Sequence, residues 1–212
     1  MPRTKRGGVL LLALLLSGCA SRSFVLRDPA YRVERSATWV VVVESPRASD
    51  LAAPTKTVGR LVANELSLRW FNVLDRDLLL QADPQLEPRL SRAAQQASLG
   101  QRVEPEVVER LSRDHGVGQL LVVDVFRYDQ FWGRETRITR VGVEARLVQL
   151  QDNRILWQGR ADPDVAGLPG GGFEAAAHRA AGELVRLMSG ELPRVEDTPL
   201  ATWPLLEHLV PN

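Results

Sequence analysis

Cysteine and lysine are almost absent from this 212-residue chain, which contains one cysteine, Cys19, and two lysines, Lys5 and Lys56. A single cysteine excludes a disulfide within the chain and a metal site built from several cysteines. The formal net charge of +1 argues against the strongly basic surface with which proteins bind nucleic acids. After residue 16, no segment approaches the roughly 20 apolar residues that a membrane-spanning helix needs.

The start of the chain has the pattern of a secretory signal peptide. Basic residues occupy positions 3, 5 and 6, and residues 9–16 form an apolar run too short to cross a bilayer. The next segment resembles a lipobox, where bacteria attach diacylglycerol to a cysteine thiol and cleave just before it. Its residues are Leu16, Ser17, Gly18 and Cys19. We predict a signal peptide over residues 1–18 and lipidation, with palmitate among the acyl chains, at Cys19.

The lipobox resemblance implies a mature chain that begins at Cys19 and is held to the membrane by its lipid. Each buried methylene contributes about 0.8 kcal/mol, so several acyl chains give a stable anchor. Ala20 stands where lipoproteins of the inner membrane typically carry aspartate, which favours the periplasmic face of the outer membrane. Because the signal peptide carries three basic residues and no acid, the mature net charge is 1 − 3 = −2.

Three parts are expected in the mature chain. Residues 19–37 are predicted to form a polar tether, residues 38–190 a single periplasmic α/β domain, and residues 191–212 a proline-rich, extended tail. A random coil of about 18 residues spans about 25 Å, which sets the expected reach of the domain from the membrane.

Hydrophobic spacing predicts alternating strands and helices in the domain. Residues 77–103, which contain Pro84 and Pro88, are the least regular part and are expected to hold one or two helical turns. In chain order, the expected elements are a buried strand over 39–43, a helix over 55–70, a short strand over 71–75, helical turns over 91–97, a helix from Pro105 with Gly116 as its C-cap, a strand over 120–126, an antiparallel hairpin over 141–147 and 155–160, and a helix over 173–188.

This order predicts an α/β fold, a single mixed-sheet sandwich with amphipathic helices packed on the sheet and a C-terminal helix.

The predicted elements also resemble those of a known superfamily in three segments. These are Phe71-Asn72-Val73-Leu74-Asp75-Arg76, the helix end and strand over His115–Val123, and the strand Val143–Val148 that turns back through Ile155-Leu156-Trp157. The superfamily comprises periplasmic lipoproteins related to the curli-secretion channel subunit, the lipoprotein activators of peptidoglycan synthases and the lipoprotein of Pel polysaccharide export.

No motif in the chain favours an enzyme. His115, His178 and His208 lie far apart in the sequence and outside the contexts of catalytic motifs. We expect His178 to be a solvated surface residue and His115 to end a helix, where the dipole favours it. The glycines at 170–172 precede a helix but lack the spacing and the lysine of a phosphate-binding loop. We therefore expect no catalysis, no cofactor and no metal ion.

Aromatic and arginine side chains gather after the predicted strand 120–126, in a segment 128–136 that is expected to be a connection with Gly133 at its turn. Exposed residues of these types are typical of interface hot spots. The candidate partner-contact residues are Tyr128, Phe131, Trp132 and Arg134. In the alternative interpretation, Phe126 and one neighbour simply complete the core.

The resemblance implies an outer-membrane lipoprotein that is a non-catalytic accessory or structural component of an envelope secretion or polysaccharide-export assembly and acts through protein–protein contacts. Activation of a peptidoglycan synthase is the alternative. The expected partners are the membrane through the lipid anchor, envelope proteins and further copies of the chain, but no nucleic acid.

Overall fold

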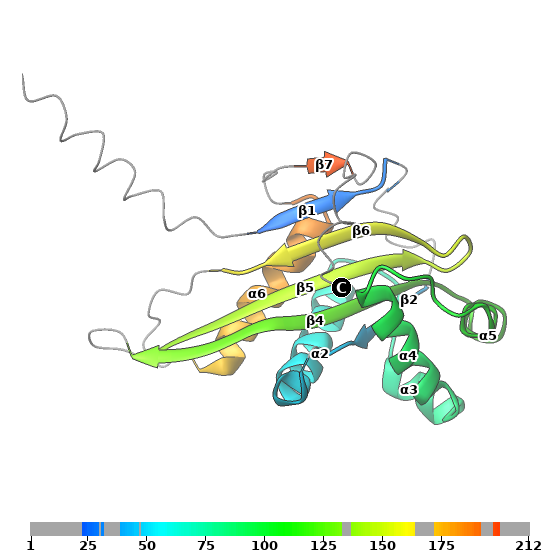
Figure 1. Cartoon of the computed structure of the whole chain (residues 1–212), viewed down its shortest axis with the longest axis horizontal. Coiled ribbons are helices and arrows are strands. Elements are labelled where there is room, and N and C mark those ends of the chain that lie inside the picture. Colours follow the sequence, from blue (N-terminus) through cyan, green and yellow to red (C-terminus); the bar gives the residue numbers. More distant parts are fainter. Residues whose placement is uncertain are drawn as a thin grey trace, which may run out of the picture.

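Seven strands form one mixed sheet in the order β3-β2-β4-β5-β6-β1-β7. The computed structural model describes residues 23–29, 31, 39–46, 48–132, 137–163, 172–191 and 197–199 (Figure 1). The strands are β1 Phe24–Arg27, β2 Trp39–Glu44, β3 Val73–Leu74, β4 Val117–Trp132, β5 Arg137–Gln149, β6 Arg154–Ala161 and β7 Asp197–Pro199. β2 runs parallel to β3 and β4, the neighbours from β4 through β1 are antiparallel, and β7 runs parallel to β1.

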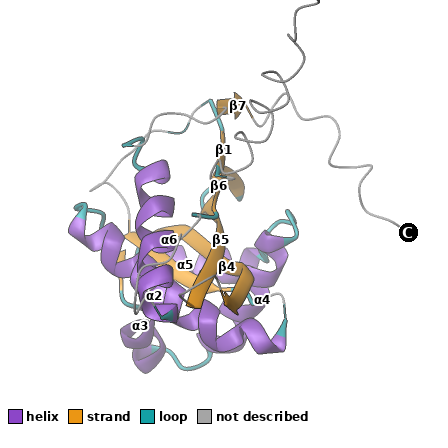
Figure 2. Cartoon of the chain, turned by 90° about the vertical axis from the view of Figure 1, so that its left-hand side faces the viewer, coloured by secondary structure: helices purple, strands orange, loops and turns teal. Residues whose placement is uncertain are grey.

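Helices cover both faces of this sheet (Figure 2). They are α2 Ala52–Leu68, α3 Arg76–Ala82, α4 Leu86–Ser98, α5 Pro105–His115 and α6 Phe173–Met188, with a short 3₁₀ helix, η2, at Ser49–Leu51. α2 and α6 pack on one face, and α3, α4 and α5 pack on the other. The predicted α/β sandwich with a C-terminal helix is confirmed.

The strand β2 contributes to both cores because its side chains alternate between the two faces of the sheet. Val40 and Val42 lie in the core under α2 and α6, whereas Val41 and Val43 lie in the core under α3, α4 and α5. All four side chains are buried. A continuous run of valines is what a strand covered by helices on both faces requires, as the sequence predicted.

Two helices occupy the segment for which the sequence predicted only helical turns over 91–97. α3 is capped by Asp75, whose carboxylate accepts hydrogen bonds from the amides of Asp77 (2.7 Å) and Leu78 (3.3 Å). Pro88 lies in the first turn of α4, where its missing N–H would have no helical partner in any case, so it does not break the helix. The prediction was wrong because both prolines were interpreted as breaks.

The chain joins the sheet earlier than the predicted boundary at residue 38. β1 pairs antiparallel with β6, and its Val25 and Leu26 are buried. Tyr31 is also buried, and its hydroxyl donates a hydrogen bond to the backbone carbonyl of Met188 (3.0 Å). The prediction of a polar tether over 19–37 was therefore wrong for this part, because a four-residue strand carries too little periodicity to be recognised.

The tail beyond α6 also contributes a strand. β7, at Asp197–Pro199, extends the sheet by pairing with β1, from Val25 opposite Asp197 to Arg27 opposite Pro199. The tail is extended at this point, as the sequence predicted, but it is part of the sheet. The apolar residues Trp203, Leu205, Leu206 and Leu209 lie outside the described residues.

Among the residues whose burial the structure describes, Trp157 is the largest fully buried side chain, and its packing requires the glycine two residues later on β6. A Cβ atom at Gly159 would lie 2.3 Å from both Cη2 and Cζ2 of the indole ring. The ring of Trp157 therefore occupies the space that a side chain at position 159 would need.

Replacement of Gly159 with alanine should lower the free energy of unfolding by about 1–3 kcal/mol, because the buried ring cannot move aside without repacking the core. Gly182→Ala is the matched control, because the nearest atoms to its Cβ are 4.0 Å away. That change should leave stability unchanged or raise it by up to about 1 kcal/mol, since alanine favours a helix interior. Urea unfolding of both variants makes the measurement, and equal effects would contradict the proposed clash.

Alkaline pH should destabilise the protein through Tyr31. Burial raises the pKa of Tyr31 from 10.0 to about 12, and the charge of Arg27 opposes this rise. Above pH 10 the unfolded chain loses the phenolic proton before the folded chain does, so the free energy of unfolding should fall between pH 10 and 12, by on the order of 2 kcal/mol. Urea unfolding across this range should show that decline, and Tyr31→Phe should reduce it. An unchanged slope in the variant would contradict the assignment.

Candidate functional site

A long antiparallel hairpin extends from one end of the sheet (Figure 1). β4 and β5 stay paired from Gln119 opposite Gln149 to Trp132 opposite Arg137. We refer to residues Arg127–Trp132 of β4 with residues Arg137–Gly142 of β5 as the hairpin overhang. The predicted connection over 128–136 was therefore wrong, because strand pairing continues through Trp132. Polar, charged and aromatic residues continue the β4 strand here, beyond the point where its continuous apolar run ends.

The base of the hairpin overhang is a β-bulge packed by an aromatic ring. The register shifts between Val125 and Arg127, which leaves Phe126 as the extra residue. A Cβ atom at Gly142 would lie 2.5 Å from Cζ of Phe126, so the ring lies directly over the glycine. The guanidinium of Arg160 covers the ring, 3.5 Å from its centroid. Glycine at position 142 is thus required for this close approach.

Ion pairs also fix the base. Arg127 donates hydrogen bonds to Asp129 (2.5 Å) and to Asp162 (3.3 Å), and Asp162 is buried. The hydrogen bond to Asp129 raises the pKa of the Arg127 guanidinium, burial opposes this, and the charge of Asp162 adds to the rise. Arg127 therefore remains charged and links β4 to the end of β6.

Three of the predicted contact residues lie on the hairpin overhang and are exposed: Trp132 at 79%, Phe131 at 37% and Tyr128 at 36%. They point to both faces of the ribbon, as alternation requires. Tyr128 meets Phe173 of α6 edge to face at 5.2 Å, and its hydroxyl accepts a hydrogen bond from Gln130 (2.8 Å). The ring of Phe131 lies under Arg140, at 4.9 Å. The exposure of Phe131 and Trp132 shows that these two side chains do not complete the core, whereas the partly buried Phe126 packs against Gly142 at the base of the hairpin.

The other predicted site residues lie outside the described residues. They are Arg134 and the lipobox residues Leu16, Ser17, Gly18 and Cys19. Their roles remain predictions.

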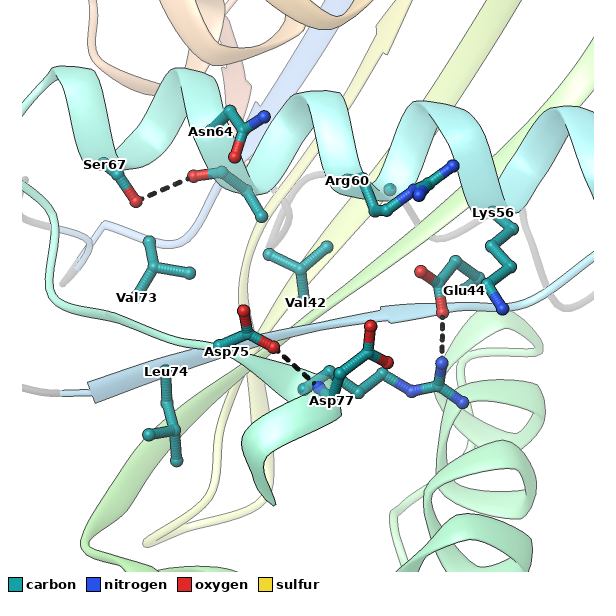
Figure 3. Close-up of a pocket in the computed structure, with 13 residues that line it drawn as sticks. Val42, Glu44, Lys56, Arg60, Asn64, Ser67, Val73, Leu74, Asp75 and Asp77 are labelled. Carbon is teal, nitrogen blue, oxygen red and sulfur yellow. Dashed lines mark hydrogen bonds and ion pairs between the residues drawn. The ribbon is translucent and has the colours of Figure 1, made fainter. Parts of the chain in front are cut away.

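A groove that the sequence did not predict runs along the edge of the sheet formed by β2 and β3 (Figure 3). β3 pairs only with Val40 and Val41, so residues 42–44 of β2 have no strand neighbour on that side in the described part of the chain. We call the resulting cavity, of about 230 Å³, the β2-edge groove. The only sequence signal for it is the shortness of the predicted strand over 71–75, which cannot cover the full edge of β2.

The two walls of the β2-edge groove differ in charge. Lys56 and Arg60 project from α2 along one wall, and Asp75 and Asp77 lie at the start of α3 on the other (Figure 3). Glu44 at the end of β2 pairs with Arg76 (3.3 Å) across its floor. An extended peptide edge flanked by opposite charges is suited to binding another strand or a polar segment.

Two of the three histidines, His115 and His178, lie on helices in the described part of the chain. His115 ends α5, as predicted, and its Nε2 lies 3.7 Å from Asp83. His178 is exposed on α6, as predicted, and His208 lies outside the described residues. Among the residues that the structure describes, no three potential metal ligands come together, and no helix is both long and apolar enough to cross a membrane.

The fold is similar to that of a solved dodecameric protein. The PelC dodecamer from Paraburkholderia phytofirmans aligns with a TM-score of 0.53 and 12% identity, over 80% of this chain and 98% of that chain. Lipoprotein GNA1162 from Neisseria meningitidis (TM-score 0.44, 19% identity, 74% and 96% covered) and the LpoB C-terminal domain from Salmonella enterica (0.33, 15%, 74% and 94%) align more weakly. No protein-family model and no curated sequence matches. The resemblance inferred from the sequence is confirmed at the level of the fold.

Removal of the ring at the bulge should loosen the hairpin overhang selectively. We expect Phe126→Ala to increase amide hydrogen exchange several-fold in residues 127–132 and 137–142, because Gly142 and Arg160 lose their packing partner. Exchange in Leu120–Val123, which lie within the two-layered core, should not change. Phe131→Ala, farther along the hairpin, is the matched control and should leave the base protected. A uniform increase along β4 would contradict this account.

Proposed function

We propose that this protein is an outer-membrane lipoprotein that serves as a structural, non-catalytic component of an envelope secretion or polysaccharide-export assembly. The observation that carries the proposal is the fold, which matches a subunit of the PelC dodecamer over nearly that whole chain. The lipobox-like segment ending at Cys19 supports attachment to the membrane. The exposed aromatic residues of the hairpin overhang and the β2-edge groove supply contact surfaces for the assembly.

Copies of the chain are the proposed occupants of the β2-edge groove. The two edges of the sheet differ, because β3 covers only part of β2 at one edge while β7 closes the other over β1. A contact between unlike surfaces is head-to-tail, and such contacts close into rings when the rotation between neighbours allows it. A ring of copies is consistent with the dodecamer formed by the PelC fold.

The position of β1 favours a membrane-proximal assembly over an activator that crosses the peptidoglycan layer. With β1 in the sheet, the five residues from Cys19 to Phe24 span at most about 17 Å. This reach is shorter than the roughly 25 Å expected for a tether that continued to residue 37. The proposed anchor therefore holds the domain close to the bilayer.

In-cell photocrosslinking from the β2-edge groove tests this function. A photoreactive residue at Arg60 should give a ladder of adducts between copies of the chain, because the groove holds its neighbour. Arg113, an exposed arginine on α5 away from the groove, is the matched control and should give none. A single adduct to a peptidoglycan synthase would establish the activator alternative and overturn the proposal, as would the absence of Arg60 adducts combined with a monomeric mass in native mass spectrometry.

A further inference from the structure

Trp70 occupies a position that is unfavourable for both its backbone and its side chain. It follows α2 with φ of 65°, in the left-handed region. Its amide donates to the carbonyl of Ser67 (3.1 Å), and the amide of Phe71 donates to that of Leu66 (3.2 Å), which is the Schellman motif that ends a helix. Glycine is the usual residue at this point, because a bulky side chain is strained there. The Trp70 side chain is also 81% exposed, so a contact outside the single chain would account for it.

An open cavity of about 600 Å³ lies at the end of the sheet opposite the hairpin overhang, between the start of α5 and the turn from β5 to β6 (Figure 1). Its apolar lining comes from Val103, Pro105, Val108 and Leu150. Asn153 fixes this lining, because its side-chain amide accepts a hydrogen bond from the backbone of Val103 (3.0 Å) and donates one to it (2.6 Å). We call this site the α5 cavity. Its volume lies within the range of pockets that enclose small-molecule ligands, so an indole ring can enter it.

The rim of the α5 cavity carries acceptors for an indole N–H. Glu104, Glu109 and Asp152 line it, together with Arg102. Each of the three carboxylates pairs with an arginine, but a carboxylate can accept several hydrogen bonds. A tryptophan that becomes buried needs a partner for its N–H while its ring contacts apolar atoms. The α5 cavity therefore suits tryptophan in both size and polarity.

Trp70 and the α5 cavity lie at the same level along the strands. Trp70 comes just before β3, at the end of the sheet where β4 begins. Leu150 of the cavity lies at that end too, because its amide donates to the carbonyl of Gly118 in β4 (2.9 Å). Trp132 is about 45 Å of strand away from Gly118. A closed ring has no translation along its axis, so in a ring whose axis follows the strands Trp70, and not Trp132, is level with the cavity.

We propose that Trp70 of one copy occupies the α5 cavity of the next copy in the assembly. The inference rests on the proposed ring of copies and names the residue and the cavity that join neighbours. The contact is head-to-tail, because each copy supplies one tryptophan and one cavity at different places on its surface. Trp70 is continuous with the β2-edge groove, whose lining includes Ser67 and Val73 on either side of it in the sequence. An aromatic anchor in a desolvated pocket is typical of an interface hot spot.

Trp70→Gly separates a contact role from a structural role. Glycine adopts φ of 65° without strain, so the variant should unfold at the same urea concentration as the dissociated wild-type chain or at a higher one. Association of the full lipoprotein in detergent, measured by mass photometry, should weaken by at least about 30-fold, the effect of a hot spot. Leu99→Ala removes a side chain that is 66% exposed at the end of α4, and this matched control should assemble as the wild type does.

Photocrosslinking from position 70 tests where the side chain goes. Benzoylphenylalanine in place of Trp70 keeps an aromatic group at this position in the full lipoprotein. We expect adducts of twice the chain mass on a denaturing gel. After trypsin cleavage, mass spectrometry should locate them in the peptides 103–110 and 147–154, which hold the lining of the α5 cavity.

The outcomes distinguish this contact from the assembly itself. Adducts in these two peptides of a second copy, with weakened association of Trp70→Gly, support the inference. Adducts elsewhere on a second copy or on another protein overturn it, as does undiminished association of Trp70→Gly, and a persisting ladder from Arg60 would then leave the ring in place. A monomeric wild-type chain without an Arg60 ladder removes the ring and with it this inference.

Discussion

The burial of β2 and β4 on both faces is the constraint on which the rest of the domain depends. A strand covered on both sides must be apolar at every position, and each face then requires its own helices. Val40 and Val42 hold α2 and α6 on one face, while Val41 and Val43 hold α3, α4 and α5 on the other. A charged side chain at any of these positions would leave one layer without its core.

The strand β4 continues beyond the part of the sheet that helices cover on both faces. Within the two cores β4 is buried, but beyond the bulge at Phe126 it continues as an exposed ribbon. The packing of Phe126 between Gly142 and Arg160 compensates for the loss of helix cover at that point. The bulge also shifts the alternation, so that Tyr128 faces α6 while Phe131 lies on the other side under Arg140. One strand thus serves the core and an exposed surface.

The sequence predicted the elements whose patterns come from burial. The valines of β2, the stripe of α6 and the C-cap at Gly116, which has φ of 67°, were all recognisable because each carries a local signature. The missed features depend on long-range pairing. β1 is stabilised by β6, the outer part of β4 by β5, and the β2-edge groove exists only because β3 stops after two residues. Neither four residues of edge strand nor the end of a neighbouring strand has a periodicity that can be read along the chain.

The place of β1 in the sheet also sets the order in which the chain can fold as it is synthesised. Phe24 pairs with Arg160, so the first strand of the domain waits for one that follows it by 136 residues. Contacts of such separation form late, because the entropy of closing the intervening loop must be overcome first. Until β6 has been synthesised, Phe24–Arg27 has no antiparallel partner. The amino-terminal strand is therefore among the last to be secured, and the sheet is completed only after most of the polypeptide is available.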